Sequence, residues 1–254
     1  MQVPSVRTVG GTPRRRGFDA PGGIVAIQDA QMMNHSPEKQ SQSYLDLMLL
    51  LNINIQDFAD VVLCLKQGAN PNTLEEDYDD YYWSNDSGLP VIFTALGWNR
   101  TGEVKMPRDL SILRALLEYG ADINAKGFDG ETPLLFALSS CHQEAVQILL
   151  EFGADVNIKE DKQGYNALMY AAECGWESLK PFEAIIERTT SINAQDNDGW
   201  TALMLAAFID ESANVELLIR RGADPRIVNN EGQSALIIAQ QEKSLHSVAY
   251  LLQV

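Results

Sequence analysis

Two short sequence words recur along this chain at a nearly constant spacing, and their repetition constrains the fold more than any other feature. The first word is GADIN at Gly120, GADVN at Gly153 and GADPR at Gly222, with weaker copies GANPN at Gly68 and TTSIN at Thr189. The second word is DGETPLLFAL, QGYNALMYAA, DGWTALMLAA and EGQSALIIAQ, whose glycines are Gly130, Gly164, Gly199 and Gly232, spaced 34, 35 and 33 residues apart. Such a period indicates stacked units that bury their apolar faces against one another.

Each part of the two words has a physical role. The glycine of the second word permits the positive φ of a tight turn between units. The Thr or Ser two residues later is placed to cap a first helix, and Pro133 suits the first turn of one copy. A second helix with an apolar face follows, and the glycine of the first word ends it in the left-handed conformation. The capping positions are Thr132, Thr201 and Ser234, and the helix-ending glycines are Gly120, Gly153 and Gly222.

The period and the two words together resemble the ankyrin repeat over about residues 42–254. The resemblance implies an all-α ankyrin-repeat solenoid, in which helix–turn–helix units are joined by β-hairpin-like loops. One departure concerns the His that usually follows the Thr-Pro-Leu step, because apolar residues replace it throughout. Those residues are Leu135, Met169, Met204 and Ile237. We expect repeats at about 42–72, 73–124 with two insertions, 125–157, 158–193 and 194–226, and a cap at 227–254.

The first forty residues differ from the rest of the chain. They carry four arginines among glycines and prolines and lack the continuous apolar run of a secretory signal. We expect residues 1–40 to be a disordered tail. Two alternatives stay open: translation from Met32 or Met33, and an organelle-targeting segment, although its glycines and prolines would interrupt an amphipathic helix.

The second repeat is longer than the others. Gly68 and Gly120 are 52 residues apart, whereas Gly120 and Gly153 are 33 apart, which leaves an excess of 19. The excess divides between the hairpin, NTLEEDYDDYYWSNDSG at residues 72–88, and the segment between the two helices, GWNRTGEVKMPRD at residues 97–109. Insertions in repeat proteins map to loops, often on the binding face. We call residues 73–88 the finger.

Three interpretations of the finger stay open. It is a solvated loop whose aromatics pack back on the array, a contact surface for a basic partner, or a calcium loop. The calcium loop is disfavoured because the glycine and the spaced final Glu of such sites are missing. In the second interpretation, aromatic anchors and steering carboxylates act together. The anchors are Tyr78, Tyr81, Tyr82 and Trp83, and the carboxylates are Glu75, Glu76, Asp77, Asp79 and Asp80.

The concave face is the other candidate surface, because hairpin tips and first helices build it in the ankyrin family. Tyr165 and Trp200 each follow the turn glycine in consecutive repeats, and Phe128 lies in the preceding tip. Large exposed aromatics at these places resemble interface anchors. The alternative is that each ring covers the start of its own helix.

Composition excludes several classes of function. A formal net charge of −16 repels nucleic acids and anionic membranes and favours basic partners. The cysteines, Cys64, Cys141 and Cys174, lack CxxC spacing, which argues against a disulfide framework or a zinc site and favours a reducing, cytoplasmic compartment. No P-loop, GxGxxG or HExxH motif occurs, and no cofactor is expected.

These observations predict a non-enzymatic, monomeric module that presents a rigid surface to a protein partner. The alternative is narrower: an inhibitor or immunity-type protein that masks a basic enzyme active site by polyanion mimicry. An enzyme of another type would need a cleft with paired titratable groups, and the sequence offers none.

Overall fold

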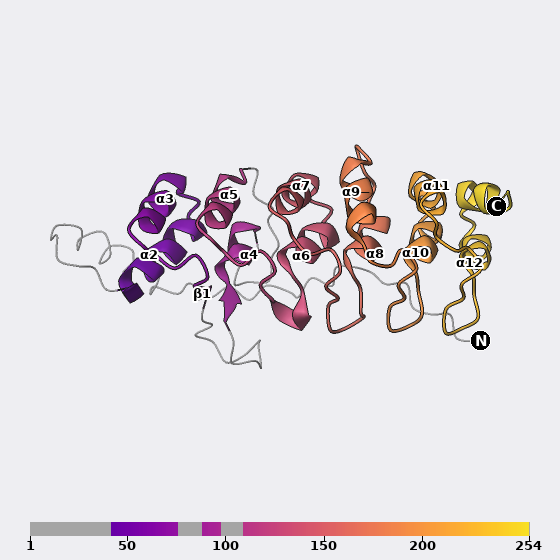
Figure 1. Ribbon diagram of the computed structural model, residues 1–254, viewed down its shortest axis with the longest axis horizontal. Helices are drawn as coiled ribbons and strands as arrows, with labels where there is room; N and C mark the ends of the chain where they lie inside the picture. The colour runs from indigo at the N-terminus through magenta and orange to yellow at the C-terminus, as the bar shows by residue number, and fades with distance from the viewer. Residues whose placement is uncertain (1–41, 76–87, 98–108, 254) are drawn as a thin grey trace, which may run out of the picture. The chain divides into compact units, whose positions relative to one another are not determined.

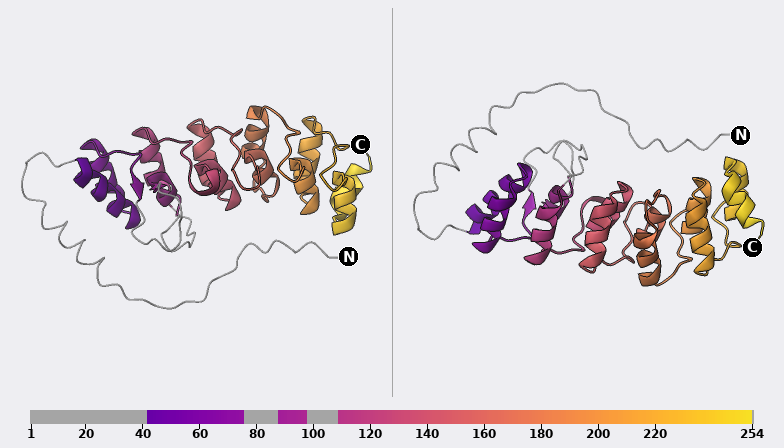
Figure 2. Two further views of the ribbon diagram at one scale, coloured as in Figure 1. Left: turned by 90° about the horizontal axis from the view of Figure 1, so that it is seen from below. Right: turned by 90° about the horizontal axis from the view of Figure 1, so that it is seen from above.

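The helices form two rows along one array. A computed structural model describes residues 42–75, 88–97 and 109–253 of the chain, and the predicted tail, residues 1–40, lies outside them. Figure 1 shows the first helix of each pair in one row and the second helix in the other, and both views in Figure 2 show the pairs following one another in sequence order. The first row is α2 (Gln42–Asn54), α4 (Val91–Ala95), α6 (Pro133–Ser139), α8 (Ala167–Ala172), α10 (Ala202–Phe208) and α12 (Ala235–Glu242). The second row is α3 (Phe58–Lys66), α5 (Ser111–Glu118), α7 (Gln143–Glu151), α9 (Lys180–Arg188), α11 (Ser212–Arg220) and α13 (Leu245–Leu251).

The first helices begin where the sequence predicted. The Thr132 hydroxyl accepts a hydrogen bond from the Leu135 amide at 3.4 Å, and the Thr201 hydroxyl accepts one from the Met204 amide at 3.3 Å. Pro133 stands in the first turn of α6, where an amide hydrogen is not needed. The same cap recurs at Ser234 in α12, so the predicted capping positions are confirmed.

The predicted turn glycines are also confirmed. Gly130 and Gly199 have φ values of 73° and 81°, and Gly153 and Gly222, which follow second helices, have values of 90° and 95°. Residues with a side chain are disfavoured in this left-handed region. Glycine therefore marks the hairpins between helix pairs and the ends of the second helices. The first of these turns falls in η1 (Phe128–Gly130), a single 3-10 turn before α6.

An asparagine in four of the five copies of the first word bonds one repeat to the next; the copy GADPR has Arg226 at this position. The asparagine side-chain oxygen accepts a hydrogen bond from a backbone amide of the following repeat. We call these residues the asparagine row. Asn72 bonds Asp122 at 2.6 Å, Asn124 bonds Asp155 at 2.9 Å, Asn157 bonds Thr190 at 2.8 Å and Asn193 bonds Asp224 at 2.9 Å.

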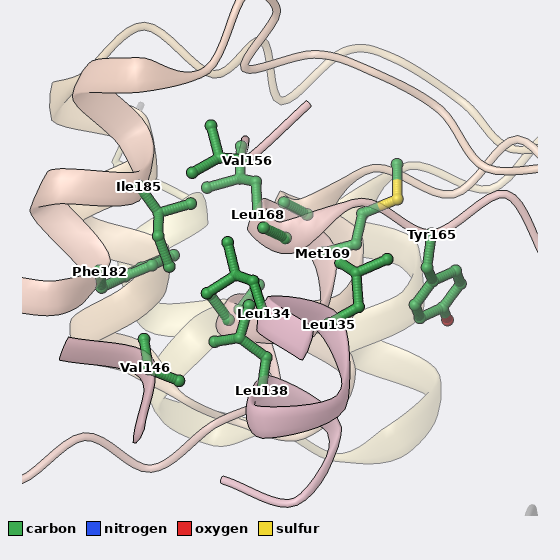
Figure 3. Close-up of a cluster of buried hydrophobic side chains, with 14 of the residues drawn as sticks. Leu134, Leu135, Leu138, Val146, Val156, Tyr165, Leu168, Met169, Phe182 and Ile185 are labelled. Carbon is green, nitrogen blue, oxygen red and sulfur yellow. The ribbon is translucent and has the colours of Figure 1, made fainter. Parts of the chain in front are cut away.

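The core lies between consecutive helix pairs. Leu134 and Leu138 of α6 contribute to it with Leu168 of α8 and Phe182 of α9, as Figure 3 shows. Met169, which stands where the family usually has His, is only 1 % exposed, and so are Leu135 and Met204 at the same place. In these three repeats an apolar side chain therefore fills the position with core packing, whereas Ile237 in the last unit is 39 % exposed.

The finger leaves the array at a short ladder. β1 (Leu74–Glu75) pairs antiparallel with β2 (Leu89–Pro90), so the chain enters and leaves the finger side by side. Both predicted insertions fall largely on residues 76–87 and 98–108, which lie outside the described residues. The bond from Asn72 to Asp122 nevertheless joins the flanking units across the insertions.

The structure supports the all-α solenoid: its strands are two residues long, and helices supply the packing. The exact repeat boundaries stay a prediction. In the part of the chain that the structure describes, no helix has both the length and the apolar character needed to cross a membrane.

Candidate protein-binding surface

Two positions in each of the last four repeats line one side of the first helices. One position follows the hairpin glycine, and the other lies eight residues later, within one residue of the helix end. We call these residues the first-helix face. The pairs are Glu131 with Ser139, Tyr165 with Glu173, Trp200 with Phe208, and Gln233 with Gln241.

Three of these pairs are in direct contact. The Ser139 hydroxyl donates to a Glu131 carboxylate oxygen at 3.4 Å, and the Gln233 side chain donates to the Gln241 side-chain oxygen at 2.9 Å. The rings of Trp200 and Phe208 meet edge to face, with centroids 5.8 Å apart and planes at 79°. The same backbone geometry thus presents a carboxylate, an aromatic pair or an amide pair, depending on the repeat.

The aromatic pair is the most apolar part of this face. Phe208 is 43 % exposed although it contacts Trp200, which is half-buried against the core. Ile209, the next residue, is 38 % exposed. An exposed ring held in place by a second ring is a preorganised apolar contact, which a partner can cover at little entropic cost.

Tyr165 does not match its predicted exposure. The prediction placed it on an exposed tip as an anchor, whereas its side chain is only 4 % exposed. Its ring packs edge to face on Tyr170, with centroids 5.1 Å apart, and lies beside the core residues Leu135 and Met169 in Figure 3. The predicted exposure of Tyr165 is therefore wrong, and its ring covers the start of its own helix instead.

The other predicted anchors have different positions. Phe128 is half-buried and packs against the core, as Trp200 does, so each presents only part of its ring. In the finger, the backbone of Glu75 is in β1. The remaining predicted finger residues lie outside the described residues: Glu76, Asp77, Tyr78, Asp79, Asp80, Tyr81, Tyr82 and Trp83.

One carboxylate that the sequence analysis did not identify has a structural role. Glu160 is 5 % exposed, and its carboxylate accepts hydrogen bonds from the amides of Lys162 at 2.6 Å, Gln163 at 2.7 Å and Tyr165 at 3.1 Å. Asp196 does the same for the next hairpin. These carboxylates stabilise the hairpin turns by accepting bonds from backbone amides. Both lie at the start of their hairpin, and this shared position is the sequence signal that could have revealed them.

Glu131 carries an unusual charge state for a surface acid. Burial raises the pKa of its carboxyl to about 7, and the nearby Glu160 and Asp129 add to the rise, while the Ser139 hydroxyl opposes it. The first-helix face therefore holds a carboxyl that changes charge near neutral pH.

The described histidines and cysteines show no arrangement for metal binding. Among the described residues, no three His, Cys, Asp or Glu side chains are placed to hold one ion. The His142 ring nitrogen Nδ1 accepts from the Ala145 amide at 3.2 Å and caps α7. His246 contacts Asp210 at 2.9 Å, so both described histidines have structural partners.

Comparison with known proteins gives sequence relatives of several kinds. An ankyrin repeat protein of Acanthamoeba polyphaga mimivirus is 28 % identical over 232 residues, which is 75 % of this chain and 51 % of that protein. The human B-cell lymphoma 3 protein is 34 % identical over 140 residues, which is 54 % of this chain and 30 % of that protein. The chain thus spans about half, or less, of the length of these relatives.

A solved structure with a similar fold comes from Bdellovibrio bacteriovorus. It is the predatory endopeptidase Bd0816 in complex with the immunity protein Bd3460. One chain of that complex matches with a TM-score of 0.62 and 26 % identity, and the match covers 81 % of this chain and 97 % of that chain.

The family described as ankyrin repeats (3 copies) matches residues 104–196 and 177–254, together more than half of the chain. Ankyrin repeats bind protein partners, and the ankyrin-repeat proteins related to this chain are generally interaction modules without enzymatic activity. The two repeated words, the glycine turns, the paired helices and these matches agree: the chain belongs to the ankyrin-repeat family.

Proposed function

We propose that this chain is a non-enzymatic binding module whose first-helix face docks on a protein partner with a basic surface. The observation that carries the proposal is the exposed ring of Phe208, held edge to face by Trp200. An aromatic pair of this kind, set among polar positions of the same face, has the composition of an interface anchor with a polar rim.

Charge supports a basic partner. The chain has a formal net charge of −16, and exposed carboxylates precede the glycine in three of the last four hairpins, at Asp129, Asp198 and Glu231. The acidic finger, whose base is the ladder of β1 and β2, contributes further carboxylates to this negative charge. Fields of one sign steer oppositely charged partners and accelerate their association, most strongly at low ionic strength.

An immunity-type role is the second candidate. The structural neighbour from Bdellovibrio is a complex of an endopeptidase with an immunity protein, and a chain of it aligns over most of this array. In that role, the finger of this chain would mimic a polyanion and cover a basic active site of an enzyme. In both versions of the proposal, the chain lies in a reducing, cytoplasmic compartment and is a monomer in the absence of its partner.

Affinity capture with four baits tests the proposal. The baits are the wild-type chain, Trp200→Ala with Phe208→Ala, residues 75–83 replaced by a short Gly/Ser turn, and Leu245→Ala with Leu252→Ala. Leu245 and Leu252 are 72 % and 65 % exposed at α13, away from the first helices, and serve as a matched apolar control. All four baits must first show the same helical circular dichroism.

We expect the double aromatic substitution to reduce recovery of the specific partner at least about tenfold, and the leucine control to retain it. Replacement of the finger should reduce capture mainly at low salt, because it removes steering charge. Recovery of the partner by the double aromatic variant within about twofold of wild type would reject the first-helix face as the docking surface. If the captured partner is an enzyme, loss of its activity on binding supports the immunity-type role, and unchanged activity rejects that role.

A further inference from the structure

Two cysteines from consecutive repeats meet in the folded chain. The Sγ atoms of Cys141 and Cys174 are 2.7 Å apart, although the residues are 33 positions apart in sequence. Cys141 lies in the turn between α6 and α7 and is exposed, whereas Cys174 follows α8 and is buried. Two thiols this close need only a small approach to reach the covalent S–S length of about 2.05 Å.

The backbone explains why Cys141 points at the next repeat. Its φ is 50°, and the corresponding turn residues Asp210 and Lys243 have φ values of 61° and 62°. Asp210 shows where such a side chain points, because its carboxylate accepts from the Ser247 amide at 2.9 Å and contacts His246 at 2.9 Å, both one repeat further on. Cys141 occupies the same place and also contacts the next repeat, although its partner, Cys174, follows a first helix, whereas the partners of Asp210 lie at the start of a second helix.

Cysteine is an unusual choice at this position. A left-handed conformation suits glycine, asparagine and aspartate, whereas other residues pay a steric cost there. Nothing in the packing of the turn requires sulfur, since Asp210 and Lys243 occupy it in other repeats. The feature that sets Cys141 apart from them is its contact with a second cysteine.

The two thiols have complementary environments. The hydrogen bond between the sulfurs lowers the pKa of Cys141 to about 7, which leaves a substantial thiolate fraction at neutral pH. The same contact and burial raise the pKa of Cys174, whose Sγ also lies 3.2 Å from the Leu138 carbonyl oxygen. An exposed thiolate beside a buried thiol is the arrangement of an attacking and a resolving cysteine.

We propose that Cys141 and Cys174 are a peroxide-reactive pair that closes a reversible disulfide between consecutive repeats. The Cys141 thiolate attacks one oxygen of hydrogen peroxide, the S–O bond forms as the O–O bond breaks, and the departing hydroxide takes a proton to become water. The Cys174 sulfur then attacks the Cys141 sulfur, the S–S bond forms, the S–O bond breaks, and the leaving hydroxide takes the Cys174 proton. In total the thiols lose two electrons and two protons, and the peroxide is reduced to two waters.

The surrounding contacts hold both cysteines ready for this bond. The Gln143 side chain, two residues after Cys141, donates to the Gly175 carbonyl at 3.0 Å. From the following repeat, the Asn214 side chain donates to the Cys174 carbonyl at 3.1 Å. The disulfide would therefore join segments that already touch, and it would lock the α8–α9 segment to the α6–α7 turn. A thiol pair that is reduced in the cytoplasm would close only under oxidative conditions.

Peroxide oxidation of the full, reduced chain tests this proposal. After treatment with hydrogen peroxide and blocking of the remaining thiols, the chain is digested with trypsin without reductant and analysed by mass spectrometry. Cys141 and Cys174 fall in separate tryptic fragments, residues 127–159 and 163–188. The variants are Cys141→Ser, Cys174→Ser and, as the matched control, Cys64→Ser at the remaining cysteine, which is buried near α2.

We expect the wild type and Cys64→Ser to yield the two fragments joined, with two thiols lost, and dithiothreitol to separate them. Cys141→Ser should slow oxidation of Cys174 at least about tenfold, because the buried thiol is a poor nucleophile. Cys174→Ser should leave a sulfenic acid on Cys141 that dimedone captures. The proposal is overturned if the wild type gives no joined fragments, whether Cys141 stays reduced or is oxidised further to the sulfinic acid.

Discussion

The asparagine row and the first-helix face run along the same array, but they differ in chemical regularity. In the row, Asn124, Asn157 and Asn193 make the same side-chain bond to a backbone amide of the next repeat. On the face, the residue after the hairpin glycine changes from Glu131 to a tyrosine, a tryptophan and a glutamine. Stacking constrains the row, whereas the face can vary without loss of fold and is therefore the place for partner specificity.

The row persists even where the sequence words degenerate. In TTSIN, Ser191 stands in place of the usual aspartate, and the bond moves to the preceding residue: the Thr190 amide donates to the Asn157 oxygen at 2.8 Å, and the Thr190 hydroxyl adds a second bond at 3.1 Å. The bond from Asn72 to Asp122 likewise spans the insertions of the second repeat. A backbone amide is available whatever the side chain, which explains why the stack tolerates these changes.

The largest expected loss of stability comes from a change at a hairpin glycine that contacts the next repeat. A Cβ on Gly199 would lie 2.8 Å from the Asn230 amide nitrogen of the next hairpin, at a φ of 81°. Gly232 has a similar φ of 75° but open space around that Cβ. We expect Gly199→Ala to lower the free energy of unfolding by about 3 kcal/mol and Gly232→Ala by only about 1 kcal/mol, measured by urea denaturation.

The difference between these two variants isolates the contact between hairpins, because both carry the same left-handed backbone strain. Equal losses for Gly199→Ala and Gly232→Ala would mean that the hairpins do not constrain one another. Stacking would then be confined to the helices and the asparagine row.

The next effect concerns the asparagine row itself. Asn157→Ala removes the acceptor for the Thr190 amide and the donor to the Arg188 carbonyl, and should lower the free energy of unfolding by about 2 kcal/mol. Asn54→Ala is the control, because Asn54 is exposed and bonds only the Leu50 carbonyl of its own helix at 3.0 Å. Its loss should stay within about 0.5 kcal/mol in the same urea titration. A similar loss in both variants would remove the special role of the row.

A smaller, pH-dependent effect is expected on the first-helix face. The folded pKa of Glu131 is raised to about 7 from its ordinary value of 4.5, so the folded state holds the proton more tightly than the unfolded state. Between these two pKa values the free energy of unfolding falls as pH rises. Above pH 7 the whole loss of stability caused by the buried charge remains. Glu131→Gln should therefore raise the free energy of unfolding by about 1 kcal/mol at pH 8, after allowance for partial exposure, and leave it unchanged at pH 4.

Ser139→Ala gives the opposite test of the same carboxyl. The Ser139 hydroxyl favours the charged form of Glu131, so its removal should raise the carboxyl pKa further and lower stability at pH 8, with no change at pH 4. Thermal denaturation at both pH values measures the two variants together. A stabilising effect of Glu131→Gln that is the same at pH 4 and pH 8 would assign it to packing rather than to charge.

The fold was largely accessible from the sequence because it depends on residues with local roles. Glycine at a left-handed turn, Thr201 at a helix start and a period near 33 residues each have one physical meaning. The asparagine row was part of the recognised words, but its role was not predicted, since its partner is a backbone amide one repeat away. Repeat spacing brings such partners together, and that spacing is the signal that could have revealed them.

The candidate site was less accessible, because exposure depends on packing between repeats. Tyr165 and Trp200 occupy the same place in the sequence pattern, yet only Tyr165 is nearly fully buried, where its ring meets Tyr170. The meeting of Cys141 and Cys174 follows from their separation of one repeat, but the side-chain direction depends on a φ of 50° that a cysteine does not signal.

The smallest expected change in stability accompanies the largest expected change in binding. Phe208→Ser removes a ring that is 43 % exposed and contacts Trp200, so we expect the free energy of unfolding to fall by only about 0.5 kcal/mol. Binding of the captured partner, measured by calorimetry, should weaken at least about tenfold. Phe152→Ser is the matched control, because Phe152 is 37 % exposed at the end of α7, in the second row of helices, and should change binding less than about twofold. If Phe152→Ser weakens binding and Phe208→Ser does not, the partner docks on the second helices, and variability along the first-helix face has another cause.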